Sequence, residues 1–277
     1  MKLATIRTPE GTRAARLTDR NAYVDLGFSD LGRLLAQEDW RVLAAEDGGR
    51  AYPADAVGLA PVVPRPGKVL CVGLNYRNHI LEMGRDLPEH PTLFAKFAEA
   101  LIGAHDDIDL APESDAVDWE AELTVVIGRT VRRADEREAA EAIAGFTVMN
   151  DVTMRDWQSR TTEWLQGKTF EGTTPLGPVL VTPDELPGGF NPAVTLSASV
   201  DGATVQKADT SDLVFCPVDL VRYASTIMTL RPGDIIATGT PGGVGHARKP
   251  ARYLTDGSTL VTEIEGIGRL KNVARAS

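Results

Sequence analysis

The pattern of apolar and polar residues along the chain predicts many short strands and few helices. Short apolar runs bounded by Gly, Pro, Asn or Asp recur throughout. Asp201-Gly202 joins two alternating runs, which predicts a hairpin over 195–206. The other runs that we expect to form strands are 3–19 (two strands around a Gly-containing turn), 68–75, 92–97, 121–128, 234–241 and 259–272. We therefore predict a mixed α+β, strand-rich fold.

Three segments have apolar residues at helical spacing. Residues 28–49 end in Gly-Gly, and residues 134–146 are opened by Asp135 and closed by Gly145. Residues 217–234 begin with Pro217 and stop at a Pro-Gly pair. A Pro-rich link near Arg65 predicts a boundary between a small N-terminal domain, residues 1–65, and a second domain, residues 66–277.

Composition and charge narrow the classes of function. The 277 residues carry a formal charge of −10 with a pI near 5.0, which argues against a nucleic-acid partner because phosphate binding needs a basic face. Two cysteines are too few for a disulfide framework. The N-terminus lacks an apolar core of signal-peptide length, and no apolar stretch approaches the ~20 residues of a membrane helix. We expect a cytoplasmic protein without a membrane partner.

Paired acidic residues are the first candidate for chemistry. Glu120 and Glu122 are two apart at the start of an apolar run, so on a strand they share a face and repel each other. Solvent at an exposed strand end, a basic side chain or a metal ion can supply the opposite charge. Asp151 ends another apolar run, where a turn residue is the alternative interpretation. Three carboxylates at strand ends would suit Mg²⁺, Mn²⁺ or Ca²⁺ rather than zinc.

A histidine, a lysine and a Gly-rich loop are further candidates. His79 and Glu82 share a face if they lie on a helical turn, which suits a general base or a plain surface pair. Lys168 follows a glycine in a loop, where it can bind a carboxylate or an oxyanion, or be solvated. Residues 237–245 form a Gly-rich loop that can bind an anion or simply turn, and they lack the spacing of a Walker loop.

The order of these motifs is more specific than any one of them. The segments VGLNYRNH, DWEAELTVVIG, NDVTMRDWQ, LQGKTF, PLGPVLVTPDE, RPGDIIATGTPGGVG and IEGIGRLKN follow one another along the chain. Together they resemble the fumarylacetoacetate hydrolase family over residues 66–275. The resemblance implies a β-roll fold around a metal site, in a protein that forms homodimers.

The resemblance also implies a ligand set for a divalent metal. The family's E-x-E pair and later aspartate fall on Glu120, Glu122 and Asp151. Mg²⁺ or Mn²⁺ is the expected cofactor, with Ca²⁺ as an alternative. Glu171 is one departure, because many relatives have aspartate there.

The family's catalytic and substrate-binding residues can be carried over in the same way. Its His-Glu dyad falls on His79 and Glu82, on a segment that closes over the site in relatives. Lys168 matches the active-site lysine and is expected to serve both catalysis and substrate binding. Gln158 matches a glutamine that contacts substrate, and Thr240 a threonine that binds a substrate carboxylate.

The implied partner is a small-molecule 2-oxo acid. The favoured expectation is a metal-dependent hydrolase that cleaves a C–C bond in an acylpyruvate or 2,4-diketo acid of the fumarylpyruvate or fumarylacetoacetate type, which gives pyruvate or an analogue plus a carboxylic acid. The alternative is an oxaloacetate-type decarboxylase or a 2-hydroxyhepta-2,4-diene-1,7-dioate-type isomerase in the degradation of aromatic compounds. All three reactions pass through an enolate, so motifs alone do not select among them.

Overall fold

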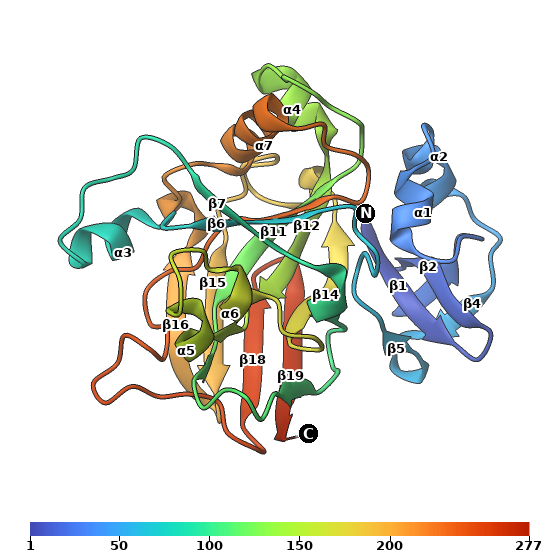
Figure 1. Ribbon diagram of the computed structural model, residues 1–277. Coiled ribbons are helices and arrows are strands. Elements are labelled where there is room, and N and C mark those ends of the chain that lie inside the picture. The colour runs from blue at the N-terminus through green and yellow to red at the C-terminus, as the bar shows by residue number, and fades with distance from the viewer. Residues whose placement is uncertain (277) are drawn as a thin grey trace.

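Two packed sheets form the body of the protein (Figure 1). The computed structural model describes residues 1–276. Within them, the large sheet has the order β4 (Ala51–Pro53), β3 (Ala22–Asp25), β2 (Gly11–Leu17), β1 (Lys2–Thr8), β14 (Thr174–Val181), β12 (Ile143–Asn150), β11 (Ala121–Ile127), β17 (Ile235–Ala237), β6 (Val69–Gly73) and β7 (Thr92–Lys96), with β5 (Gly58–Leu59) beside β1 and β8 (Leu101–Ile102) beside β14. The five-stranded sheet has the order β16 (Ala203–Asp209), β15 (Thr195–Val200), β18 (Thr259–Ile264), β19 (Gly268–Ala276) and β9 (Ile108–Leu110). A short ladder joins β10 (Val117–Asp118) to β13 (Thr153–Met154).

The helices are short and lie at separate places around the sheets rather than forming a layer of their own. The α-helices are α1 (Leu31–Leu35), α2 (Trp40–Ala45), α3 (Arg77–Glu82), α4 (Glu136–Ala142), α5 (Arg155–Gln158), α6 (Leu165–Lys168) and α7 (Pro217–Ile227). The 3-10 turns are η1 (Ala54–Ala56), η2 (Ala98–Ala100), η3 (Pro183–Glu185) and η4 (Thr210–Asp212). In Figure 1, α4 and α7 lie side by side, while α3 projects away from the sheets. Among the described residues, no helix is long and apolar enough to cross a bilayer. The predicted strand-rich mixed fold is confirmed.

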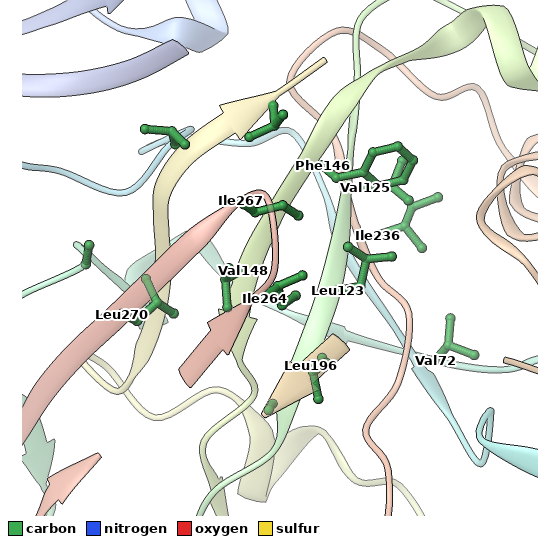
Figure 2. Close-up of a cluster of buried hydrophobic side chains, with 14 of the residues drawn as sticks. Val72, Leu123, Val125, Phe146, Val148, Leu196, Ile236, Ile264, Ile267 and Leu270 are labelled. Atoms are coloured by element: carbon green, nitrogen blue, oxygen red, sulfur yellow. The ribbon is translucent and has the colours of Figure 1, made fainter. Parts of the chain in front are cut away.

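The central strand β11 is buried on both faces, and the two faces differ in character. Leu123 and Val125 point into the core between the sheets, where Phe146 and Leu196 also lie (Figure 2). Because side chains alternate along a strand, Glu122 points to the opposite side. The same strand therefore contributes to the core with one face and to the polar site with the other.

Two of the predicted helices end differently in the structure. Residues 28–49 form the two short helices α1 and α2. The helix predicted to close at Gly145 ends at Ala142, after a start capped by Asp135 as expected. Gly145 instead lies inside β12, where an added Cβ would be 2.3 Å from the Val181 carbonyl oxygen. The close approach of two strands, and not a helix stop, requires this glycine.

The N-terminal strands continue the large sheet. Strand β1 pairs with β2 and β5 and also with β14, so the first 65 residues lie against the rest of the chain. Leu31 and Leu34 share a buried cluster with Val126 and Leu180. The domain boundary near Arg65 stays a prediction.

Candidate active site

Three buried carboxylates meet where β11 begins and β12 ends. Glu120 precedes β11, Glu122 lies on it, and Asp151 follows β12. Ala121 pairs with Asn150 in antiparallel register, and the Asp151 N–H donates to the Glu120 carbonyl oxygen at 2.8 Å. One carboxylate oxygen from each acidic residue lies within 4.8 Å of the others. Strand pairing thus joins residues that are far apart in sequence.

Burial makes this acidic cluster energetically demanding. Glu120, Glu122 and Asp151 are 7%, 1% and 0% exposed, so the interpretation of an exposed strand end is wrong. Burial, together with the charges of Asp151 and Glu120, raises the pKa of Glu122 well above its usual range. The Gly239 N–H donates to Glu122 Oε2 at 2.8 Å and partly offsets this effect. The site therefore favours a bound cation.

Two buried lysines supply part of the opposite charge. Lys168 Nζ donates to Glu120 Oε2 and to Asp151 Oδ2, both at 2.8 Å. Lys96 Nζ donates to Asp151 Oδ1 at 2.6 Å and to the Val152 carbonyl oxygen at 3.1 Å. Both lysines are 2% exposed, so the alternative of a solvated Lys168 is wrong. The sequence analysis missed Lys96, whose signal was a lysine that closes an apolar strand run.

The carboxylates keep Lys168 charged. Burial lowers the pKa of Lys168, but Asp151 and Glu120 outweigh burial and hold this pKa above its usual value. An ammonium group carries three N–H donors, and Lys168 uses two of them on protein groups among the described residues. One donor therefore remains for a ligand.

Arg155 and Asp118 form a second buried charge pair that the sequence analysis did not identify. Arg155 Nε donates to Asp118 Oδ2 at 2.8 Å, and Arg155 Nη2 lies 2.7 Å from Glu120 Oε1. Asp118 also accepts hydrogen bonds from the N–H groups of Gly245 and His246 at 2.7 and 2.9 Å. One carboxylate thus holds both the guanidinium and the end of the Gly-rich loop in place. The only signal in the sequence was an acidic residue just before the E-x-E pair.

Close packing of two short helices places Gln158 beside Lys168. Gln158 Oε1 accepts a hydrogen bond from Arg155 Nη1 at 3.0 Å. A Cβ added to Gly167 would lie 2.4 Å from the Gln158 nitrogen and 2.5 Å from the Met154 carbonyl oxygen. Only glycine allows α6 to approach α5 this closely, and the next residue is Lys168.

The Gly-rich loop after β17 presents Thr240. Its Oγ1 donates to the Ala121 carbonyl oxygen at 3.0 Å and accepts from Gln206 Nε2 at 2.9 Å. Gln206 Oε1 in turn accepts from the Ala121 N–H at 3.0 Å, a positioning contact that the sequence analysis missed. Gly239 has a φ of +99°, and a Cβ there would be 2.8 Å from the Val72 carbonyl oxygen. The loop is therefore fixed to β11 through named contacts.

His79 and Glu82 lie on α3 and face the same loop. A Cβ added to Gly242 would be 3.0 Å from His79 Nδ1 and 3.7 Å from Glu82 Oε2. The family resemblance implies that His79 and Glu82 act as a pair. In the described part of the chain, no hydrogen bond joins their side chains. Burial lowers the pKa of His79 below its usual value, although Glu82 and Glu120 act in the opposite direction. The imidazole is therefore neutral near pH 7.

One cavity of about 170 Å³, here called the site cavity, collects most of the candidate residues. Its polar lining consists of His79, Glu120, Arg155, Gln158, Lys168 and Thr240. Glu122 and Asp151 lie beside it within the acidic cluster. A second cavity of about 480 Å³, here called the outer cavity, shares His79 and is also lined by Glu82. Five of the eight predicted residues thus line one small space.

The donor set fits a hard divalent cation. Carboxylate oxygens are the ligands that Mg²⁺, Mn²⁺ and Ca²⁺ prefer, and Glu120, Glu122 and Asp151 provide three of them on one side of the site. Besides burial, repulsion from the charges of Asp151 and Glu120 raises the pKa of Glu122. A divalent ion would offset that repulsion.

Comparisons with known proteins identify the family. The family model described as fumarylacetoacetate (FAA) hydrolase C-terminal matches residues 68–275. The chain is 46% identical over 215 residues to the oxaloacetate tautomerase Fahd2a, mitochondrial, of Rattus norvegicus, which covers 77% of this chain and 68% of the relative.

Solved structures extend the similarity to the whole chain. A 5-carboxymethyl-2-hydroxymuconate delta-isomerase from Mycobacterium smegmatis is 34% identical with a TM-score of 0.83, over 100% of this chain and 99% of that one. A maleylpyruvate hydrolase from Sphingobium sp. SYK-6, solved with manganese(II) and pyruvate, is 27% identical with a TM-score of 0.81, over 100% of both chains. From the buried carboxylates, the motif order and these matches, the chain belongs to the fumarylacetoacetate hydrolase family of enzymes.

Proposed function

We propose that this protein is a metal-dependent enzyme that interconverts the keto and enol forms of a small 2-oxo diacid such as oxaloacetate. The observation that carries the proposal is that a neutral histidine and a charged lysine line one small cavity beside a buried carboxylate triad. At about 170 Å³ the site cavity is smaller than the ~300–1,000 Å³ typical of pockets for drug-sized ligands, which favours a short acid. The similarity to an oxaloacetate tautomerase supports the same substrate class.

The charged groups of the site cavity suit the 2-oxo acid end of such a substrate. Lys168 has one N–H left to donate, and it can stabilise the negative charge that develops on the 2-oxo oxygen. Gln158 offers amide N–H donors for the carboxylate, whereas Thr240 could donate to it only by giving up its hydrogen bond to the Ala121 carbonyl oxygen. A divalent ion held by Glu120, Glu122 and Asp151 would act as a Lewis acid on the 2-oxo group.

His79 is suited to move the proton. In the keto-to-enol direction a base takes a proton from the carbon next to the 2-oxo carbonyl, the C–H electron pair becomes the C=C bond, and the carbonyl oxygen takes a proton from the protonated base or from water. The neutral imidazole of His79 can accept the first proton, since burial lowers the pKa of His79. The reverse direction returns that proton to carbon.

The test follows the enol form of oxaloacetate by its ultraviolet absorbance. Metal-depleted protein and protein supplied with Mg²⁺ or Mn²⁺ are compared, and pyruvate and CO₂ are assayed in parallel. We expect faster keto–enol exchange only with metal, and no release of pyruvate. Lys168→Met should remove the acceleration, whereas Lys271→Met, at an exposed position, should not. Equal rates with and without metal would contradict the proposal.

Cleavage of a C–C bond in an acylpyruvate is the second candidate, as the sequence analysis favoured. The observation that supports it is that His79 lines both the site cavity and the larger outer cavity, which can supply water to the imidazole. His79 would take a proton from water, and the hydroxide would attack the distal carbonyl. Pyruvate plus a second acid would mark this reaction, CO₂ release would mark a decarboxylase, and an absorbance shift of an unsaturated diacid without cleavage would mark an isomerase.

A homodimer remains part of the proposal. The family resemblance is its only support, and light scattering coupled to size exclusion tests it. A mass near twice 29.7 kDa is expected.

A further inference from the structure

Two aromatic side chains, here called the aromatic wall, line the site cavity. Trp164, which directly precedes α6, and Phe94 of β7 both line this cavity. Their rings meet edge to face, with centroids 5.5 Å apart and planes at 73°. Lys168 Nζ lies 4.9 Å from the centroid of the Phe94 ring. The wall therefore begins next to the charged end of the cavity.

Gly73, at the end of β6, provides the space for Trp164. A Cβ added at this glycine would lie 2.6 Å from Trp164 Cζ3 and 3.0 Å from Cη2, while its next neighbour, Thr92 Cγ2, would be at an ordinary 3.7 Å. The φ of Gly73 lies outside the left-handed region, so its backbone does not require glycine. The indole ring alone excludes a side chain here.

The two ends of the site cavity differ in chemistry. Arg155, Gln158 and Lys168 gather at one end and suit the carboxylate and 2-oxo group of an acid. Trp164 and Phe94 provide apolar surface for the rest of the acid. Trp164 has the largest side chain in the apolar lining that a substituent of the acid can contact.

We propose that Trp164 is a specificity-determining residue that limits the length of the 2-oxo acid substituent, and that Gly73 is glycine in order to seat it. This inference rests on the proposed function, because it assumes that the cavity binds a 2-oxo acid. Trp164 is half-buried, and the five residues before it, 159–163, are all exposed. Trp164 is thus carried by an exposed segment that joins α5 to α6.

Binding of a homologous series tests the length limit without relying on turnover. Straight-chain 2-oxo acids from pyruvate to 2-oxooctanoate are titrated by calorimetry into the Mn²⁺-loaded wild type, Trp164→Ala and Trp164→Phe. Removing the wall should strengthen binding of the longest acids by about 10-fold or more, the range that pocket size produces, and leave pyruvate nearly unchanged. The control is Leu165→Ala, whose side chain is more than a third exposed and does not line the cavity.

Two outcomes separate the inference from the proposed function. If the folded Trp164 variants keep the length profile of the wild type, Trp164 does not set the limit and only this inference is overturned. If the wild type binds none of these acids and does not act on oxaloacetate, the proposed function is wrong and the inference falls with it.

Stability measurements test the role of Gly73 separately. Gly73→Ala should lower the free energy of unfolding of the protein that keeps Trp164, because the alanine methyl group meets the indole ring. In a Trp164→Ala background the same substitution should lower it much less. The free energies of unfolding of the four proteins form a double-mutant cycle. Equal losses in the two backgrounds would show that Gly73 does not seat Trp164.

Discussion

The acidic cluster and the His79 segment contribute to the same cavity but are held in different ways. Glu122 and Asp151 lie at the paired ends of two central strands, buried and joined to lysines and backbone N–H groups. His79 is half-buried on the short helix α3, which projects from the sheets in Figure 1, and Glu82 beside it is exposed. The charged end of the site is therefore preorganised by the fold, whereas the base lies on a segment with less support.

We expect the largest effect, on metal affinity and activity together, from a substitution in the acidic cluster. Glu122→Gln removes one negative ligand, so the affinity for Mn²⁺ should fall by ~100-fold or more and activity should be lost with it. Calorimetric titration with Mn²⁺ measures the affinity directly. Glu263→Gln, on an exposed position of β18, is the matched control and should bind Mn²⁺ like the wild type. Unchanged binding in Glu122→Gln would remove this residue from the ligand set.

A substitution of His79 on α3 should lower the rate strongly without loss of metal binding. His79→Ala should lower kcat by about 10²–10⁴-fold, the usual contribution of a general base, while its Mn²⁺ affinity stays that of the wild type. Steady-state kinetics and the same titration check the two halves of this expectation. A variant that works at the wild-type rate would show that His79 is not the base.

The stability of the acidic cluster should depend on the lysine that sequence analysis missed. Lys96→Met leaves Asp151 with fewer partners in a buried place, so we expect a loss of ~3–5 kcal/mol in the free energy of unfolding. Denaturant titration of metal-free protein measures it. Arg275→Met breaks an exposed pair with Asp107 and should cost at most about 1 kcal/mol. Similar losses in both variants would mean that burial is not what makes Lys96 important.

The smallest expected effect is a shift in pH dependence. The neutral form of His79 is needed as the base, so kcat/KM rises with pH through the pKa of this histidine. Because burial lowers that pKa, activity should persist below the usual value of about 6.5. Glu82 raises the pKa of His79, so Glu82→Gln should move the acid limb to still lower pH. A limb that stays in place, or one that survives in His79→Ala, would contradict the assignment.

The sequence predicted local relations well because they depend on local geometry. Glu120 and Glu122 lie close together because they are two apart where the chain enters β11, and the 195–206 hairpin follows from its Asp-Gly turn. The meeting of Asp151 with Glu120 depends instead on the register between β11 and β12, which the number of intervening residues does not fix. Family resemblance, rather than spacing, indicated this contact.

The residues that were missed act through long-range packing. Lys96 looked like an ordinary lysine at the end of a strand, and it becomes a partner of Asp151 only because of where the fold places the end of β7. Gly145 looked like a helix stop, and the approach of β14 to β12 overrode that local preference. Asp118 and Gln206 organise a loop more than 30 residues away from each of them in the chain.

The exposed segment 159–163 before Trp164 has a consequence for how such an enzyme can diversify. The acidic cluster lies at the ends of strands that also supply side chains to the core, so a change there endangers folding as well as chemistry. The segment that precedes Trp164 is exposed and can accept substitutions, insertions or deletions at low cost. A lineage can therefore explore new substrates by remodelling one short loop while it inherits the reaction chemistry intact.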